Sequence, residues 1–290
     1  MTVVRNYLRE MRIHHYIKNL LILVPLICSG NLLNFEKLQN GICGSLAFCM
    51  VSYAIYFIND IKDIEKDKLH PTKRFRPIAS GNIQIHSAII FTIFLLILAL
   101  ISNYICFTIF SSLLLLLYFI INIGYSFGLK NIPLLDICIL VSGFLIRILY
   151  GAIVTDIQIS HWLYLVVISV AFYLGLGKRR NELKYKGEYN TREVIQKYPF
   201  DFLDNNMYVF MSLIFVFYAL WTVDKTTIVS YHGNELFWTI PIVIIIFLKY
   251  SLNIEKVSDG DPVEVLIHDK VLILLCILYC LLMVMLLYVV

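Results

Sequence analysis

Charged residues are scarce in this sequence. Only 15% of its 290 residues are Asp, Glu, Lys or Arg, while 60% are hydrophobic and the mean hydropathy is +0.79. Soluble domains carry about a quarter charged residues, so this composition excludes an ordinary water-soluble domain and indicates a bilayer as the solvent. No nucleic-acid partner is expected.

Metal-binding and disulfide patterns of cysteine are also missing. The seven cysteines lie in apolar segments and form neither a CxxC pair nor a Cys/His cluster. This excludes a disulfide framework and a zinc site, and small buried hydrophobic side chains are the expected role. No cleavable signal is recognised, because Met1–Arg12 is polar and basic and the first apolar run resembles a retained span.

Long apolar runs are what the sequence has in abundance. A helix needs on the order of 17–25 residues to cross a bilayer, and nine runs approach that length. They are Leu20–Leu38, Gly41–Ile61, His86–Ser102, Ile105–Ile123, Pro133–Val154, His161–Gly177, Met207–Val223, Phe237–Leu252 and Val271–Val290. The predicted fold is an all-α polytopic bundle of nine transmembrane helices, forming one domain over residues 1–290.

The basic residues fall almost entirely on one side of this map. If the N-terminus is inside, every Lys and Arg lies in a cytoplasmic segment except Lys37, Lys225 and Arg147. The positive-inside rule therefore predicts a cytoplasmic N-terminus in an inner-membrane protein. Functional loops are expected on the cytoplasmic side, near residues 59–82, 124–132, 178–205 and 253–270.

An acidic cluster ends the second predicted span. At ~100° per residue, Asn59, Asp60, Asp63 and Asp67 share one face of a continuous helix, and Glu65 points to the other side. Like charges at this spacing repel each other, so a compensating cation is expected. Mg²⁺ suits the site because it takes one or two carboxylates together with water and phosphate oxygens. A solvated acidic helix end is the alternative.

A basic segment follows the acidic cluster. Lys73, Arg74 and Arg76 follow it, in a loop that two prolines are expected to hold extended. Guanidinium groups bind phosphate well, so the carboxylates that bind metal and these cations together indicate a diphosphate site. Lipid headgroups could also attract these cations, but they would not explain the carboxylates.

A second basic loop is expected after the sixth span. Lys178, Arg179 and Glu182 lie three and four residues apart, so a short helix could present them together. Because this segment has no second Asp cluster, it is predicted to hold phosphate without its own metal ion. A positive-inside anchor is the alternative.

Several polar residues are expected inside the bundle. Arg147 would lie ~16 Å deeper than Asp136 along the fifth span, where a cation normally faces a bundle interior. It could contact an anionic substrate or pair with another buried group, and the sequence leaves both open. The further candidate substrate-binding residues are Lys18, Asn19, Tyr125, Lys130 and Asp136.

These motifs resemble those of the UbiA superfamily of intramembrane prenyltransferases. The resemblance rests on the Asn59–Asp67 run, the later Arg-Pro-x-x-x-Gly and nine spans, and it covers essentially the whole chain. Members generally hold a prenyl diphosphate through Mg²⁺ with two Asp-rich motifs. Here the second motif is missing, and Gly177–Glu182 occupies its place.

That departure is similar to one branch, the polyprenyl-phosphate phosphoribosyltransferases. The string HPTKRFRPIASG from His70, the segment Tyr125–Lys130, the KRxxE loop and Gly260–Glu264 look like its hallmarks, as does Arg12 with Tyr16–Asn19. The His15-Tyr16 pair departs mildly, because an aromatic residue such as Trp is expected there.

The resemblance implies transfer of 5-phosphoribose from phosphoribosyl diphosphate to a polyprenyl phosphate. Asp60, Asp63 and Asp67 would hold Mg²⁺ on the diphosphate, with Asn59 as a further contact. Lys73, Arg74 and Arg76 would bind the donor, and Lys130, Lys178 and Arg179 the acceptor phosphate or the ribose 5-phosphate. No general base is expected, because the acceptor phosphate is already an anion. A homo-oligomer is compatible with the sequence.

Two other functions fit less of the sequence. A prenyltransferase acting on an aromatic or lipid-alcohol acceptor would be expected to have an Asp pair within Lys178–Lys197, which offers none. A transporter of phosphorylated metabolites would suit an interior Arg147, but broken helices or inverted repeats are not seen. The transporter also leaves the clustered aspartates unexplained.

Overall fold

The computed structural model describes residues 2–184, 193–225, 227–228, 235–255 and 262–288. These residues form helices and turns, with no strand in the described ranges. They fall into two compact units, each described separately below. The first unit is Met1–Leu26, Leu32–Leu129 and Ile146–Ile157, and the second is Ile27–Asn31, Lys130–Leu145 and Gln158–Val290.

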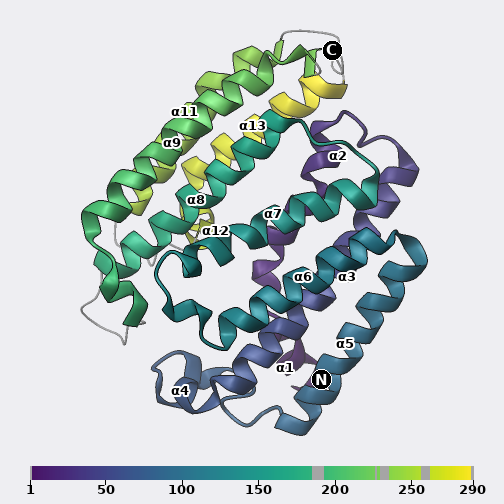
Figure 1. Ribbon diagram of the computed structural model, residues 1–290, viewed down its shortest axis with the longest axis vertical. Coiled ribbons are helices and arrows are strands. Elements are labelled where there is room, and N and C mark those ends of the chain that lie inside the picture. The colour runs from purple at the N-terminus through teal and green to yellow at the C-terminus, as the bar shows by residue number, and fades with distance from the viewer. Residues whose placement is uncertain (1, 185–192, 226, 229–234, 256–261, 289–290) are drawn as a thin grey trace. The chain divides into compact units, whose positions relative to one another are not determined.

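The first unit combines long helices with several short helical elements (Figure 1). They are α1 (Thr2–Glu10), the 3-10 helix η1 (Ile13–Leu23), α2 (Val24–Cys28), α3 (Phe35–Lys62), α4 (Ile64–Leu69), η2 (Lys73–Phe75), α5 (Ile85–Cys106), α6 (Ile109–Ser126) and η3 (Leu129–Asn131). The elements α2 and η3 each extend across a boundary between the two units. Helix α7 (Leu135–Thr155) begins in the second unit and ends in the first.

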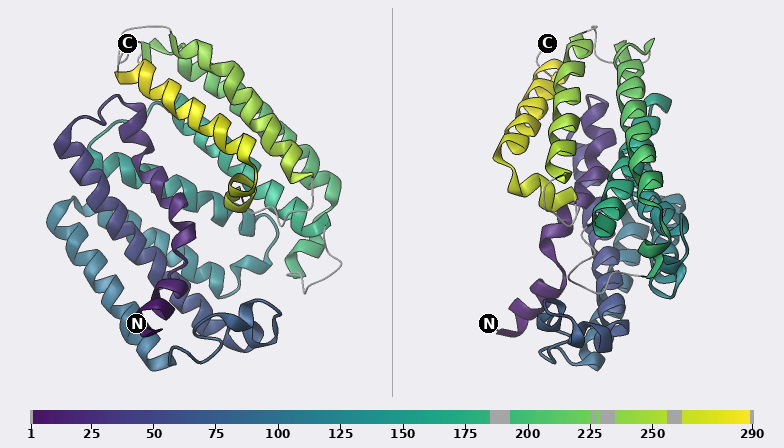
Figure 2. Two further views of the ribbon diagram at one scale, coloured as in Figure 1. Left: turned by 180° about the vertical axis from the view of Figure 1, so that it is seen from behind. Right: turned by 90° about the vertical axis from the view of Figure 1, so that its left-hand side faces the viewer.

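The remaining helices belong to the second unit. They are α8 (His161–Lys184), η4 (Glu193–Lys197), α9 (Phe200–Thr222), η5 (Glu235–Thr239), α11 (Ile240–Ile254), α12 (Pro262–His268) and α13 (Lys270–Tyr288). Helices α8 and α9 run side by side in both figures (Figures 1 and 2). A buried cluster that includes Tyr173, Leu176, Leu203 and Met207 fills the space between them.

Eight helices in the described ranges are long and apolar enough to cross a membrane. Helix α3 has 28 residues and is therefore ~42 Å long, which exceeds the ~30 Å hydrocarbon core. On α5 and α13 many apolar side chains face outward, as Ile90 and Leu274 do with 69% and 65% exposure. An apolar outer surface is what a bilayer requires, so this chain is a multi-pass membrane protein.

The first predicted span differs from the structure. The segment Lys18–Cys28 is helical but too short to count with the eight, and a turn with Gly30 at φ 72° follows it. Asn34 then caps a new helix, because its side chain accepts a hydrogen bond from the Lys37 amide at 3.2 Å. The expected continuous helix Leu20–Leu38 is therefore wrong, and the total of nine spans stays a prediction.

The first unit is packed around α3. Phe48, Val51 and Ile55 of α3 form a buried cluster with Leu115 of α6 and Tyr150 of α7. Helix α7 approaches η1 so closely at Gly151 that an added Cβ would lie 2.0 Å from the Ile22 carbonyl oxygen. Only glycine fits this contact, which brings the neighbouring turn of α7 against η1.

Candidate functional site

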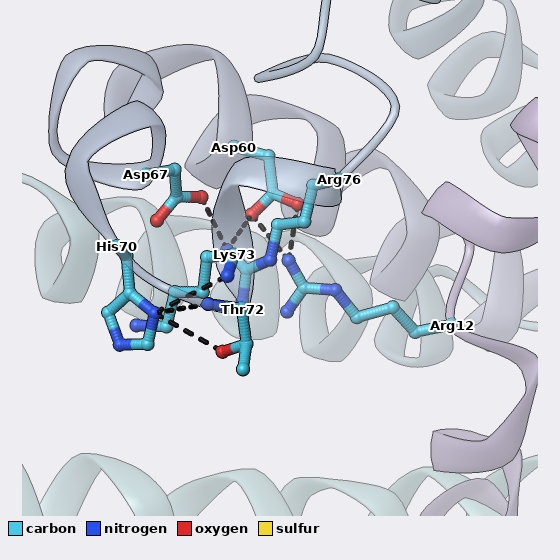
Figure 3. A network of polar contacts seen from close by, with 7 residues as sticks. All are labelled: Arg12, Asp60, Asp67, His70, Thr72, Lys73 and Arg76. Atoms are coloured by element: carbon cyan, nitrogen blue, oxygen red, sulfur yellow. Dashed lines mark hydrogen bonds and ion pairs between the residues drawn. The ribbon is translucent and has the colours of Figure 1, made fainter.

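Asp60 and Asp67 converge at the end of α3, although they do not share one continuous helix. Helix α3 ends at Lys62, Asp63 (φ −93°, ψ 10°) leaves the helical conformation, and α4 begins at Ile64. This break brings Asp67 toward Asp60, and both are nearly buried, with 4% and 3% exposure. One nitrogen of Arg76 binds both carboxylates, at 3.0 Å from Asp60 and 2.6 Å from Asp67 (Figure 3).

A second arginine reaches the same carboxylate from the N-terminal segment. The Arg12 guanidinium forms an ion pair with Asp60, and its central carbon lies 5.0 Å from the Tyr56 ring centre. Arg12 itself adopts a left-handed backbone (φ 51°) between α1 and η1. Figure 3 shows Arg12 and Arg76 converging on Asp60 from different segments of the chain.

The segment His70–Gly81 is compact rather than extended. The residues before its two prolines, His70 and Arg76, do have extended backbones as predicted. Between them, however, η2 and successive turns fold the chain, and Nδ1 of His70 lies 3.3 Å from the backbone nitrogens of Thr72 and Lys73. The expected extended loop is therefore wrong, because local hydrogen bonds close it into turns that carry Arg76 back to the aspartates.

A cavity of about 310 Å³ lies beside these groups. Cationic side chains dominate its wall, and two carboxyl groups and a hydroxyl group join them. The residues that line it are Arg9, Glu10, Arg12, Asp60, Thr72, Lys73, Phe75, Arg76 and Pro77. This volume is at the lower end of known ligand pockets, which span roughly 300–1,000 Å³.

Glu10 is the unexpected member of this wall. It ends α1 and is 1% exposed, and its carboxyl group lies beside the Asp60 carboxyl and the Ile78 backbone. Burial raises the pKa of Glu10 to about 8, and the nearby Asp60 carboxyl adds to the effect. Near neutral pH the group therefore carries a proton for much of the time.

The donor set is compatible with a divalent cation bound together with phosphate. Two carboxylates lie within reach of a single guanidinium nitrogen, and Mg²⁺ commonly uses one or two carboxylates with phosphate oxygens and water. Among the described residues no three His, Cys, Asp or Glu side chains form a metal cluster. The predicted set of three aspartates is thus reduced here to Asp60 and Asp67, with arginines as their present counter-ions.

The other predicted residues of this segment have different surroundings. Asp63 is half-buried at the helix break, and Arg74 is exposed and stacks on Phe75 at 4.8 Å. The Asn59 amide accepts a hydrogen bond from Ser126, so it ties α3 to α6. Glu65 is 84% exposed and pairs with Lys68, which confirms that it faces away from the cluster.

Arg147 is held by neutral groups in the first unit. It is 7% exposed, donates to Asn19 at 2.8 Å and to Tyr118 at 2.9 Å, and stacks on Phe48. Asn19 in turn donates to the Cys49 sulfur. Of the two roles left open for Arg147, these contacts favour the structural one, and they give Asn19 the same role.

The second unit buries the centre of the predicted basic loop. Lys178, Arg179 and Glu182 belong to α8, so the expected loop is wrong at its start. Arg179 is 1% exposed and bonds to Asp136 and Glu182 at 2.6 Å each. Asp136 also accepts a hydrogen bond from the Tyr198 hydroxyl. The spacing of Arg179 and Glu182 was predicted correctly, but burial argues against direct phosphate binding by Arg179.

Four predicted residues remain accessible in part. Lys18, Tyr125, Lys130 and Lys178 are each half-buried, and each has further polar or electrostatic contacts. Residues 256–261, including the first part of the Gly260–Glu264 motif, lie outside the described residues. Arg9 and Glu10 were missed because a basic N-terminal segment is ordinary in membrane proteins, and no local spacing connects Glu10 with Asp60.

Comparison with known proteins gives a consistent result. The UbiA prenyltransferase family matches residues 23–266. The chain is 31% identical over 283 residues to decaprenyl-phosphate phosphoribosyltransferase of Mycolicibacterium smegmatis, covering 93% of this chain and 88% of that protein. It is 28% identical to the protein of the same name from Corynebacterium glutamicum, covering 97% and 86%.

Solved structures share the fold. A UbiA homologue from Archaeoglobus fulgidus bound to GPP and Mg²⁺ matches with a TM-score of 0.68 at 19% identity, covering 96% of this chain and 99% of that one. At this identity the likeness concerns the fold alone. The family match, the relatives and the fold agree, and the chain belongs to the UbiA prenyltransferase family.

Proposed function

We propose that this chain transfers 5-phosphoribose from phosphoribosyl diphosphate to a polyprenyl phosphate and releases diphosphate. The cavity of the first unit supports this most directly, because it places four cationic side chains beside the buried pair Asp60 and Asp67. Relatives named decaprenyl-phosphate phosphoribosyltransferase, which match most of the chain, support the same donor and acceptor class.

Each side of the cavity has a role in this reaction. Asp60 and Asp67 would hold Mg²⁺ together with the diphosphate, and the ion would stabilise charge on the leaving group as a Lewis acid. Arg12 and Arg76 now neutralise these carboxylates, and with Lys73 they would bind phosphate oxygens of the donor. Asp63, Asn59 and the exposed Arg74 stay candidates for outer contacts of the same site.

The chemistry requires little proton transfer. An oxygen of the lipid phosphate forms a bond to the anomeric carbon of ribose while the bond from that carbon to the diphosphate breaks. Because the lipid phosphate is already an anion, no base must remove a proton. Oriented cations in a poorly hydrated site can then supply most of the rate enhancement through positioning and electrostatics.

The acceptor and the cellular setting belong to the proposal as well. Lys130 and Lys178 are candidates for the acceptor phosphate, and the isoprenoid tail would lie among apolar side chains that face the lipid. We place the site at the cytoplasmic face of the inner membrane, because the basic segments gather there in the predicted topology. A homo-oligomer is compatible with this arrangement.

A direct assay tests the proposal. Purified full-length protein is incubated with Mg²⁺, labelled phosphoribosyl diphosphate and a polyprenyl phosphate, and label in the lipid phase is measured. A parallel reaction contains a prenyl diphosphate and 4-hydroxybenzoate, because the structural neighbour from Archaeoglobus fulgidus was solved with GPP. Product only in the second reaction would replace phosphoribosyl transfer with prenyl transfer.

Matched variants test the carboxylate site. Asp60→Asn is expected to lower turnover at least ~100-fold, as loss of a key electrostatic contact does in other enzymes. Glu65→Gln is expected to remain within about threefold of wild type, because Glu65 lies on the exposed side of α4. Near-normal turnover of a folded Asp60→Asn protein would contradict the proposed site.

A further inference from the structure

Helix α1 has one apolar face and one polar face. At ~100° per residue, Val3, Val4, Tyr7 and Leu8 fall within an arc of roughly 140°, and Arg9 lies opposite the centre of that arc. Val3 and Val4 are 66% and 64% exposed, and Leu8 is 45% exposed. A helix of nine residues is too short to be stable alone in water. Its exposed apolar face therefore indicates a further apolar surface against which α1 lies.

The apolar face borders a groove of about 300 Å³ between α1 and α5. Its inner wall is formed by aromatic rings, because Tyr7 packs edge-on against Phe91 at 4.8 Å and stacks on Phe57 at 6.0 Å between ring centres. The lining consists of apolar and aromatic residues, Val3, Val4, Tyr7, Leu8, Met11 and Phe91. This lining offers mostly hydrocarbon surface, so the ligand that it suits is a hydrocarbon chain.

The groove adjoins the surface of α5 that faces lipid. Ile90, next to Phe91, and Phe94, one turn further, are 69% and 55% exposed. Phe91 lies six residues after Ile85, the first residue of α5, and therefore ~9 Å along the helix axis. Amphipathic helices on a bilayer bury their apolar face ~5–10 Å into the boundary between headgroups and acyl chains. Helix α1 thus contacts α5 at the depth of such a helix.

The direction of α1 fits the same position. In the right-hand view of Figure 2, α1 runs across the direction of α3, which is long and apolar enough to span a membrane. A helix that lies in the plane of the membrane surface is expected to cross the spanning helices in this way. Arg5, on the polar side of α1, is exposed and suits the anionic headgroups of bilayer lipids.

We propose that α1 is an in-plane membrane anchor: Val4 and Leu8 insert among acyl chains of the leaflet next to the candidate site, and acyl chains of bilayer lipids fill the groove. This inference does not depend on the substrates of the proposed function. It has a consequence for the site, because Arg9 and Glu10 at the end of α1 and the following Arg12 belong to the wall of the polar cavity. The bilayer surface would then help to set the position of that wall.

Site-specific photo-cross-linking identifies what covers the apolar face. The photoreactive amino acid benzoylphenylalanine replaces Val4 in one full-length protein and Asn6 in another, each in nanodiscs of phosphatidylcholine and phosphatidylglycerol. Asn6 lies ~200° further round α1, on its polar face, and provides the matched control. Lipid adducts are expected at position 4 in at least about fivefold excess over position 6, because only the apolar face lies among acyl chains. Equal yields, or no lipid adduct at position 4, would overturn the proposal.

Two other occupants would give different products. A cross-linked dimer in place of the lipid adduct at position 4 would assign the apolar face to a second copy of the chain. With polyprenyl phosphate present as a minor lipid of the nanodisc, polyprenyl adducts above its share of the lipid would assign the groove to that molecule. Either result overturns the anchor proposal, whereas the proposed function is tested separately by the transfer assay.

Matched charge variants test whether lipid contact holds the helix in place. Val4→Asp puts a carboxylate among acyl chains, and Asn6→Asp adds the same charge on the polar face. In nanodiscs, trypsin is expected to cleave after Arg9 at least about tenfold faster in Val4→Asp than in wild type, because a carboxylate in hydrocarbon is costly. Asn6→Asp should be cleaved at the wild-type rate. The same rate in all three proteins would contradict the anchor.

Discussion

Arg179 is the largest side chain that the described part of the chain buries completely, and its charge is balanced by Asp136 and Glu182. An ion taken out of water is tolerated only when its partners remain in place. The hydroxyl of Tyr198 completes the hydrogen bonds around Asp136. At this residue the positive charge maintains the packing of the second unit, so its loss should affect folding more than substrate affinity.

Asp136→Asn should therefore be strongly destabilising. It removes the fully buried carboxylate from the Arg179 network and leaves the partly exposed Glu182 as the countercharge, and breaking a buried pair costs about 3–5 kcal/mol in other proteins. Thermal unfolding in detergent should show a clearly lower midpoint than wild type. Lys178→Gln serves as the control, because Lys178 precedes Arg179 in the chain and is only half-buried. This variant should unfold near the wild-type midpoint. An equal drop in both variants would argue against a special role for the ion pair.

Residue spacing predicted part of this arrangement and missed the rest. The i,i+3 contact of Arg179 with Glu182 follows from helical geometry alone. The contact with Asp136 joins residues 43 positions apart, and no local pattern encodes such a pairing. The same limit explains why the sequence did not predict that Glu10 lies beside Asp60, since only tertiary packing brings the end of α1 to the end of α3.

Helix length was predictable, whereas helix breaks were harder to see. Runs of apolar residues revealed the long elements because a bilayer requires about 20 of them per span. The break at Asp63 lies within IKDIEKDK, which contains neither glycine nor proline. It nevertheless turns α4 so that Asp67 meets Arg76, which a continuous helical wheel could not show.

The ends of α8 and α11 are joined by a charged network that should depend on pH. Glu255 accepts a hydrogen bond from Lys184 at 2.9 Å and pairs with Arg180. The hydrogen bond from Lys184, aided by Arg180, lowers the pKa of Glu255 below its usual value. Stability from this group is therefore complete above its ordinary pKa near 4.5 and is lost as pH falls through the lower folded value.

Glu255→Gln should reveal this contribution. Its midpoint of thermal unfolding should lie slightly below wild type at pH 7, because partly exposed pairs contribute only about 0–1 kcal/mol. The difference should vanish as the pH is lowered well below 4.5, where wild-type Glu255 also becomes protonated. A difference that grows toward low pH would contradict the sign of the pKa shift.

Across the whole molecule, charge and apolar surface are segregated. Long helices present apolar side chains outward, whereas the acidic and basic groups of the candidate site gather in α1, the end of α3 and the segment up to Gly81. This segregation explains why the sequence alone indicates the region of the candidate site, although it does not give the geometry of that site. It does not determine which side of the membrane the site faces, and the positive-inside rule supplies that prediction.

The orientation can be tested at the two ends of α3. Leu33 is 80% exposed just before this helix and Lys66 is exposed just after it, and a helix of ~42 Å separates them. With the N-terminus inside, Leu33→Cys should react with a membrane-impermeant maleimide in intact cells. Lys66→Cys should react only in inverted vesicles, and the wild-type protein measures background from its native cysteines. The reverse pattern would place the carboxylates on the outer face, where cytosolic phosphoribosyl diphosphate could not reach them.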